Sequence, residues 1–268
     1  MTVLFGIVVV IVVLYLFLIM PRIASRPMQE FKDVYVAHRG FHDNDSDAPE
    51  NSAKAMRLAV ENGYGIELDV QLTKDEKVVV FHDASLKRVC GVDAKVNSMT
   101  YEELQQLHLL NSEEKIPLFS EVLKIIDGKV PLVMEIKMVD SKTRVCELAN
   151  EELEGYKGVY CMESFHPFAV QWYKKNRPDV IRGQLSANFK KEDNKEGFQE
   201  WLVHHLLTNV LARPDFVAYS HKSAGNLSRN LCRFFGATAV AWTIKSQEQY
   251  KKARPHFDLF IFDSFILK

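Results

Sequence analysis

The hydrophobic pattern of the chain alternates between short aliphatic runs and longer stretches in which apolar residues recur every three or four positions. Runs rich in Val and Ile, each followed by an amphipathic stretch, predict β-α-β units and a parallel sheet. Amphipathic helices are predicted between most of these runs, for example over residues 51–63, 119–128 and 226–236. The strands are predicted over residues 34–40, 65–73, 77–83, 130–138, 158–165, 180–187, 215–221, 238–245 and 259–265.

This number of strands, spread over residues 34–268, fits a closed (β/α)8 TIM barrel in both count and size. An open, doubly wound sheet is the alternative, but no GxGxxG turn follows the first strand. Residues 84–117 interrupt the alternation of strands and helices. We predict that they form a small insertion on the rim of the barrel.

The first twenty residues differ from the rest because residues 3–20 carry no charge. As a helix they would extend roughly 27 Å at about 1.5 Å per residue, close to the hydrocarbon thickness of a bilayer, about 30 Å. We therefore predict a transmembrane anchor over residues 1–21 and a linker over 22–33. A secretory signal peptide is the alternative, but no Lys or Arg precedes the apolar run and no A-x-A site follows it.

Charge and cysteine content narrow the possible partners. The chain has 34 basic and 35 acidic residues and a net charge of −1, with no basic block that would suggest nucleic acid as a partner. Arg22, Arg26 and Lys32 follow the apolar run, and the positive-inside rule then predicts a cytoplasmic barrel. The 4 cysteines form no CxxC pair, which favours free thiols over a structural zinc site.

The strand predicted at 65–73 contains the first sign of chemistry. Glu67 and Asp69 interrupt an otherwise aliphatic run, and side chains two residues apart in a strand point the same way. Two carboxylates in one small volume raise each other's pKa and repel unless a cation lies between them. Buried carboxylates are retained mainly where they are paired or bind a metal.

Neighbouring strand candidates carry further ionisable residues near their ends, where barrel enzymes place their active sites. Each of these side chains alone is more often structural, but together they form a set of acids, histidines and cations. Oxygen ligands from Glu67, Asp69 and Glu135 suit Ca²⁺ or Mg²⁺ rather than zinc. His38 and His82 can act as general acid and general base, and Arg39 and Lys137 can bind an anion. The set fits metal-assisted cleavage of a phosphodiester.

Several segments also resemble a known family. "AHRGFHDNDSDAPENS", "IELDVQLTKDEKVVVFHD", "KIPLFSEVL", "MEIK" and the later "SF" and "AWTI" are similar, in order and rough spacing, to glycerophosphodiester phosphodiesterases. The resemblance extends from about Val34 to the C-terminus. It implies a (β/α)8 barrel with a small insertion after an early strand, and an enzyme that releases sn-glycerol 3-phosphate and an alcohol.

The resemblance also implies roles for individual residues. Glu67, Asp69 and Glu135 would bind the metal, His38 and His82 would be the acid–base pair, and Arg39 and Lys137 would contact the phosphate. Supporting roles would fall to three further residues: Glu50, which as a first-turn helix acid also has a purely structural explanation, and Phe165 and Trp242, which would wall the glycerol end of the pocket. The C-terminal "FDLFIFDSFILK" lacks the Gly-rich, Pro-containing ending common in relatives, although Asp263 is kept.

The resemblance leaves the attacking group open, because either the substrate's own 2-hydroxyl or a water could attack the phosphorus. An anchored barrel would also meet lysophospholipids, so a lysophospholipase D is an alternative function. A non-catalytic, membrane-anchored binding protein is a second alternative, and the unusual C-terminus is the one feature that favours it. Ca²⁺ and Mg²⁺ are equally compatible with the three acids.

Overall fold

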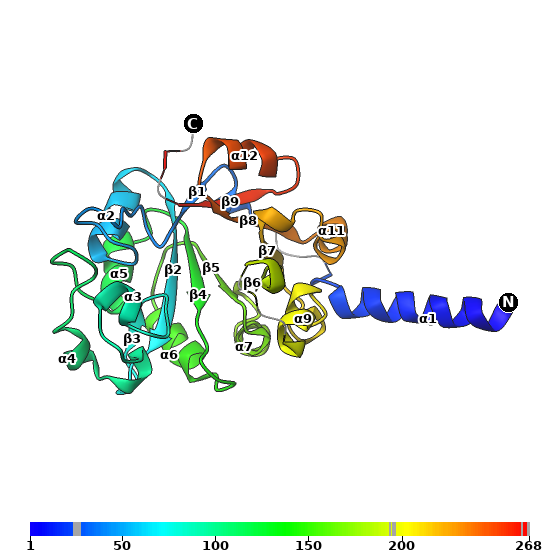
Figure 1. The fold of residues 1–268 in the computed structure, drawn as a ribbon, viewed down its shortest axis with the longest axis horizontal. Helices are drawn as coiled ribbons and strands as arrows, with labels where there is room; N and C mark the ends of the chain where they lie inside the picture. Colours follow the sequence, from blue (N-terminus) through cyan, green and yellow to red (C-terminus); the bar gives the residue numbers. More distant parts are fainter. Residues whose placement is uncertain (24–27, 193, 195–196, 264, 267–268) are drawn as a thin grey trace.

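Eight parallel strands close into a barrel in the computed structural model, which describes residues 1–23, 28–192, 194, 197–263 and 265–266 (Figure 1). The strand order is β1-β9-β8-β7-β6-β5-β4-β2, and β1 pairs with β2 to complete the ring. The predicted TIM barrel is therefore confirmed. The barrel strands are β1 (Tyr35–His38), β2 (Gly65–Leu72), β4 (Leu132–Ile136), β5 (Tyr160–Ser164), β6 (Ile181–Ser186), β7 (Phe216–Ser220), β8 (Thr238–Ile244) and β9 (Leu259–Phe262).

The strand predicted at 77–83 departs from this pattern. It forms β3 (Val78–Val80), which pairs antiparallel with β2 and is not one of the barrel strands. The reason is the short connection between β2 and β3. Its ends lie close together, since the Thr73 backbone N–H donates to the Lys77 carbonyl at 3.0 Å. Parallel neighbours need a crossover of about a dozen residues. The connection between β2 and β3 is much shorter, and it therefore permits only a hairpin.

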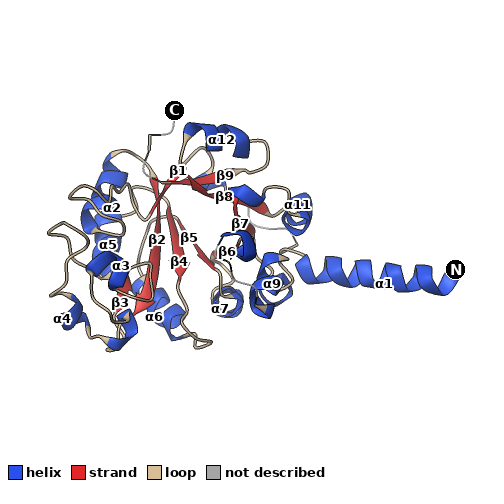
Figure 2. Cartoon of the chain, viewed as in Figure 1, coloured by secondary structure: helices blue, strands red, loops and turns tan. Residues whose placement is uncertain are grey.

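Helices surround the strands, as the colours of Figure 2 make plain. Those that cover the outside of the barrel are α2 (Ala53–Glu61), α5 (Phe119–Ile126), α6 (Arg144–Glu152), α7 (Pro167–Asn176), α8 (Phe189–Glu192), α9 (Phe198–His204), α10 (Asn209–Ala212), α11 (Leu227–Phe234) and α12 (Gln247–Ala253). Ser52 caps α2 by accepting a hydrogen bond from the Ala55 N–H, whereas the neighbouring Asn51 adopts a positive φ of 58°. The Asn51 side chain therefore does not cap the helix and bonds to Asp69 inside the barrel instead.

Two apolar cores hold the barrel together. The larger lies between strands and helices and includes Leu68, Met134 and Phe119, all fully buried. The smaller fills the barrel interior towards its N-terminal end, with Val36, Val133 and Phe216. Full burial of such side chains stabilises the fold by about 1.5–3 kcal/mol each. The polar residues considered below lie at the opposite end of the interior.

Residues 84–117 carry the short helices α3 (Lys87–Cys90) and α4 (Tyr101–Leu104) and pack as a rim insertion. Thr100 and Glu103 form a capping box at the start of α4. The insertion has an apolar cluster of its own, in which Leu86, Leu104 and Ile116 are fully buried against Val79 of β3. The insertion is therefore a small packed unit attached to the hairpin.

The apolar N-terminal segment forms one helix, α1 (Thr2–Ile19), which projects away from the barrel (Figure 1). Its C-terminal end, from Tyr15 onward, contacts the domain. The Tyr15 hydroxyl lies 2.8 Å from the Ser228 hydroxyl, and Asn209 Nδ2 donates to the Ile19 carbonyl at 3.0 Å. Arg213 donates to the carbonyls of Phe17 and Met20 at 2.7 and 2.9 Å. Arg26, one of the predicted flanking charges, lies outside the described residues.

Candidate active site at the barrel mouth

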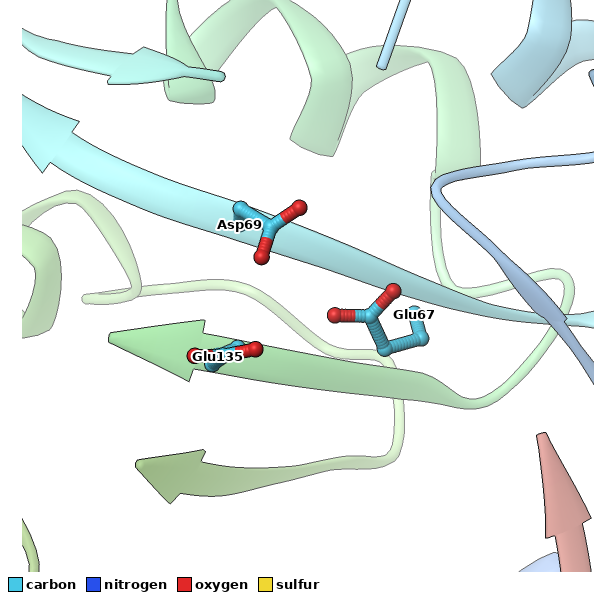
Figure 3. A group of neighbouring side chains, drawn as sticks. All are labelled: Glu67, Asp69 and Glu135. Atoms are coloured by element: carbon cyan, nitrogen blue, oxygen red, sulfur yellow. The ribbon is translucent and has the colours of Figure 1, made fainter. Parts of the chain in front are cut away.

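Three carboxylates from neighbouring strands meet inside the barrel (Figure 3). The β2–β4 register sets Asp69 directly beside Glu135, and Glu67 lies two residues earlier on the same face of β2. Their exposures are only 2% for Glu67, 0% for Asp69 and 7% for Glu135. One oxygen from each lies within 4.8 Å of the others. The alternation of the strand brings the three predicted acids together.

The charges around these acids are uneven. Lys137 Nζ lies 3.0 Å from Asp69 Oδ1 and 2.7 Å from Glu135 Oε1. Burial opposes ionisation of Asp69, but the charge of Lys137, together with those of His82 and Arg39, outweighs it and holds the pKa of Asp69 below its usual range. Among the described residues, no lysine or arginine side chain comes as close to Glu67. Burial together with the charge of Asp69 raises the pKa of Glu67 well above the usual range. With all three acids ionised, the cluster would carry more negative charge than Lys137 and Arg39 neutralise.

This arrangement fits a divalent cation. The donor set consists of carboxylate oxygens alone, which hard cations such as Ca²⁺ and Mg²⁺ prefer over thiolate or imidazole sites. A cation beside Glu67 would supply the positive charge that this side chain lacks. The residues fit both ions equally well.

The two predicted histidines stand near the acids in different surroundings. His38 lies beside Glu67 as its register partner in the β1–β2 pairing, with Nε2 3.9 Å from Glu67 Oε2 and Nδ1 4.0 Å from Asp263 Oδ2. Burial, together with the Arg39 charge, lowers the pKa of His38 well below its usual range. His38 is therefore largely neutral at neutral pH.

His82 is more accessible and is oriented by an acid. Its Nδ1 lies 2.6 Å from Asp83 Oδ1. Burial opposes ionisation of Asp83, but hydrogen bonds from His82 and Arg88 hold its pKa below the usual range. An ionised carboxylate can only accept, so the proton of this bond belongs to His82 Nδ1. In the neutral ring, Nε2 is then the nitrogen that can accept a proton, and His82 lines the cavity described below.

Arg39 lies directly after β1 with a left-handed φ of 55°. Its backbone N–H donates to Glu67 Oε2 at 3.0 Å, and its guanidinium donates to Glu50 Oε1 at 2.6 Å. Glu50 is 4% exposed and precedes α2, so it is a buried partner of Arg39 and not a solvated first-turn acid. The Arg39 Nε also lies 3.6 Å from Asp69 Oδ2, so the guanidinium borders the acid cluster.

Arg88 is a site residue that the sequence pattern does not reveal. It comes from α3 of the rim insertion and donates to both oxygens of Glu50, at 2.8 and 2.7 Å. It also donates to both oxygens of Asp83, at 2.6 and 3.0 Å. One guanidinium therefore supports the partner of Arg39 and the partner of His82. Nothing local in "LKRVC" signals this contact.

Two further polar residues complete the interior. Asn51 Nδ2 donates to Asp69 Oδ2 at 2.9 Å. Glu163 on β5 pairs in register with Glu135 and is 1% exposed; burial and the Glu135 charge raise its pKa well above the usual range. Its position within the predicted strand 158–165 is a signal, since it interrupts an apolar run as Glu67 does.

Aromatic residues line one side of the mouth. Phe165 and Trp242 pack edge to face with ring centroids 5.5 Å apart, and Lys137 Nζ lies 5.9 Å from the Phe165 centroid. Beside them a cavity of about 660 Å³ extends from His82, Glu135 and Lys137 towards α9 and α10. Its wall combines His82, Glu135 and Lys137 with apolar side chains, among them Ile136, Met138, Val139, Phe165, Phe168, Phe189, Leu202 and Leu211.

Comparisons with known proteins agree with this geometry. A model of the glycerophosphoryl diester phosphodiesterase family matches residues 38–255. A glycerophosphodiester phosphodiesterase of Bacillus altitudinis is 35% identical over 164 residues, covering 57% of this chain and 66% of that protein. Human glycerophosphodiester phosphodiesterase 1 is 30% identical over 267 residues, covering 86% and 78%. The crystal structure of a glycerophosphodiester phosphodiesterase from Thermotoga maritima superimposes with a TM-score of 0.65 at 28% identity, covering 86% of this chain and 95% of that one.

Proposed function

This chain belongs to the glycerophosphoryl diester phosphodiesterase family, and from that premise we propose that it hydrolyses a glycerophosphodiester to sn-glycerol 3-phosphate and an alcohol. The observation that carries the proposal is the cluster of Glu67, Asp69 and Glu135 at the barrel mouth. Two histidines and two cationic side chains border that cluster. A complete set of this kind argues against a non-catalytic binding protein.

Each group has a chemical task in this reaction. A divalent cation held by the three acids would supply positive charge to the phosphoryl oxygens and favour ionisation of the attacking hydroxyl. Arg39 and Lys137 bind and orient the phosphate, and their charge stabilises the transition state. His38 and His82 move the protons, one accepting from the attacking oxygen and the other donating to the leaving oxygen. Asp83 keeps His82 in the tautomer with the proton on Nδ1.

The test is turnover of glycerophosphocholine by the full chain with Ca²⁺, Mg²⁺ or EDTA. We expect metal-dependent release of glycerol 3-phosphate that is lost in Glu67→Gln and retained in Glu76→Gln, which alters an exposed carboxylate paired with Arg144. His38→Ala should lose turnover and keep metal binding, measured by calorimetry. An active His38→Ala would contradict its role in proton transfer. Tight metal binding without turnover by the unmodified chain would favour the binding-protein alternative.

A second candidate substrate is a lysophospholipid, and the apolar cavity is the observation that favours it. A volume of about 660 Å³ is within the usual range for organic ligands, roughly 300–1,000 Å³. A glycerol phosphodiester with a small head group is polar and has little use for a wall built from Met138, Phe168, Leu202 and Leu211. An acyl chain attached to the glycerol would occupy that wall.

A comparison of two substrates separates these candidates. As a lysophospholipase D, the enzyme would have a higher kcat/KM for lysophosphatidylcholine than for glycerophosphocholine. Leu211→Gln would then lower turnover of the lysolipid while turnover of the soluble diester stays unchanged. A clear preference of the unmodified enzyme for glycerophosphocholine would exclude the second candidate.

The N-terminal helix also supports a proposal about location. α1 is long and apolar enough to cross a membrane, with a mean hydropathy of 3.2. Its last turn is part of the folded domain, because Asn209 and Arg213 hold the carbonyls of Phe17, Ile19 and Met20. Removal of a signal peptide would strip these side chains of their partners, so we infer that α1 is a retained anchor. The flanking basic residues predict a cytoplasmic barrel.

Sequencing of the N-terminus of the protein purified from membranes tests retention. An intact start near Met1 is expected, and a start after Met20 would identify a cleaved signal peptide. Protease protection in sealed vesicles then reports the side on which the barrel lies.

A further inference from the structure

The joint between α1 and the barrel fixes the direction in which the barrel faces a membrane. Ile19 is fully buried, and its carbonyl accepts from Asn209 at the start of α10. The Tyr15 hydroxyl meets Ser228 in the first turn of α11. The Arg213 guanidinium lies 4.7 Å from the centroid of the Phe17 ring. These contacts, made by residues 15–19, fasten the end of α1 to the barrel.

The free part of α1 is too short to cross a bilayer unaided. Side chains are exposed from Thr2 to Leu14, where the large apolar residues are 43–75% accessible, and from Tyr15 onward the domain begins to cover the helix. At about 1.5 Å per residue the free segment extends roughly 20 Å, whereas the hydrocarbon core measures about 30 Å. A mismatch of this size draws flanking protein surface into the interface or thins the bilayer. Because the end of α1 is fastened to the barrel, the protein surface drawn into the membrane interface is that of the barrel.

The barrel surface beside the joint is suited to that position. α10 contacts the end of α1, and α9 and α11 are seen beside the base of α1 in Figure 1. The Asn226 side chain connects α9 and α11 by donating to the His204 carbonyl. The large apolar side chains that they expose include Phe198 at 74%, Trp201 at 50% and Leu227 at 65%. Leu227 directly precedes Ser228, the partner of Tyr15. Tryptophan and other amphipathic aromatic residues are enriched at membrane–water interfaces.

We propose that the α9–α11 face, defined by Phe198, Trp201 and Leu227, lies in the interfacial layer of the membrane that α1 crosses. The occupant of this face is a lipid bilayer. The proposal rests on the retained anchor and is independent of the catalytic assignment. It also places the cavity wall formed by Leu202 of α9 close to the bilayer surface, whereas a barrel on a free linker would face in all directions.

Tryptophan quenching tests the proposal in the full chain. The protein is reconstituted into phosphatidylcholine–phosphatidylglycerol vesicles containing lipids brominated either near the head groups or near the chain ends. We expect quenching by the head-group-proximal bromines, stronger than by the deep ones. Trp201→Phe should remove most of it, and Trp172→Phe, which alters a half-buried ring on α7, should leave it in place.

The outcomes distinguish the face from the anchor. Quenching that is the same in Trp201→Phe as in the unmodified chain would overturn the proposal for the face while leaving the anchor intact. A chain that fails to float with the vesicles would overturn the anchor and the face together, without bearing on turnover of glycerophosphocholine. Flotation with strong, Trp201-dependent quenching would support both.

Discussion

Replacement of Arg88 by methionine separates the support of the active site from its chemistry. Arg88 touches none of the predicted catalytic or metal-binding residues, yet it donates four hydrogen bonds to Glu50 and Asp83. Glu50 in turn accepts from Arg39, and Asp83 pairs with His82. Methionine preserves much of the side-chain volume and removes every donor. The variant therefore loosens both Arg39 and His82 without altering either.

The expected effect on stability is modest. The Arg88 side chain is 46% exposed, and solvent screening reduces ion pairs at such positions to about 0.2–1 kcal/mol each. Glu50, which is nearly buried, retains Arg39 and Asn44 as hydrogen-bond donors. We therefore expect a loss of about 1–2 kcal/mol in the free energy of unfolding. The effect on catalysis should be larger, a fall of about 10–100-fold in kcat/KM, as is typical when residues that orient active-site groups are removed.

The assay is steady-state turnover of glycerophosphocholine, with urea unfolding on the same samples. Lys87→Met is the matched control, because it removes the same charge from the same helix at an exposed position. Arg88→Lys should restore turnover only in part, since one ammonium group cannot bridge two carboxylates in the way a guanidinium does. Full activity of a folded Arg88→Met, or an equal loss in Lys87→Met, would refute the reasoning.

Three further outcomes are expected. Ca²⁺ or Mg²⁺ at a hundredfold excess over Kd should stabilise the folded state by about 2.7 kcal/mol and so raise the thermal unfolding midpoint. Glu67→Gln should abolish this shift, and a shift that survives in the variant would place the ion elsewhere. Burial raises the pKa of Glu152 to about 7, so the folded state holds a proton that the unfolded chain releases near 4.5. The free energy of unfolding therefore falls as pH rises between these two values. Glu152→Gln should flatten that fall in urea unfolding, and an unchanged pH profile would contradict the assignment. In Gly183→Ala the added Cβ would collide with the Phe216 ring, so we expect a loss of about 1–3 kcal/mol, whereas Gly225→Ala, with open space around it, should be neutral.

The parts of the site that lie on barrel strands could be predicted from the sequence. Glu67 and Asp69 stand out because they interrupt an aliphatic run at a spacing that fixes their common direction. Glu135 on β4 and Lys137 directly after β4 stand out in the same way. The regular parallel register then brings these residues to the same depth, so the local pattern and the closed ring together determine the cluster.

The parts that depend on loops could not be predicted. Arg88 meets Glu50 across 38 positions of sequence, through a turn of the insertion that no periodicity describes. Asn51 is a residue type that often caps helices, but its backbone has a positive φ and its side chain bonds to Asp69. Ser52 caps the helix instead. The direction of β3 was missed because periodicity identifies a strand and not its orientation; the short link after Thr73 is the feature that decides it.

The separate apolar cluster of the rim insertion makes this segment a cooperative unit of its own. Small units with few contacts to the main core open at lower free energy than the strands beneath them. Opening of α3 and α4 would carry Arg88 away from Glu50 and Asp83 while the barrel hydrogen bonds stay intact. Amide exchange in residues 84–117 should accordingly run ahead of exchange in β2 and β4. On heating, the enzyme should lose activity before its barrel melts, and recover it quickly on cooling.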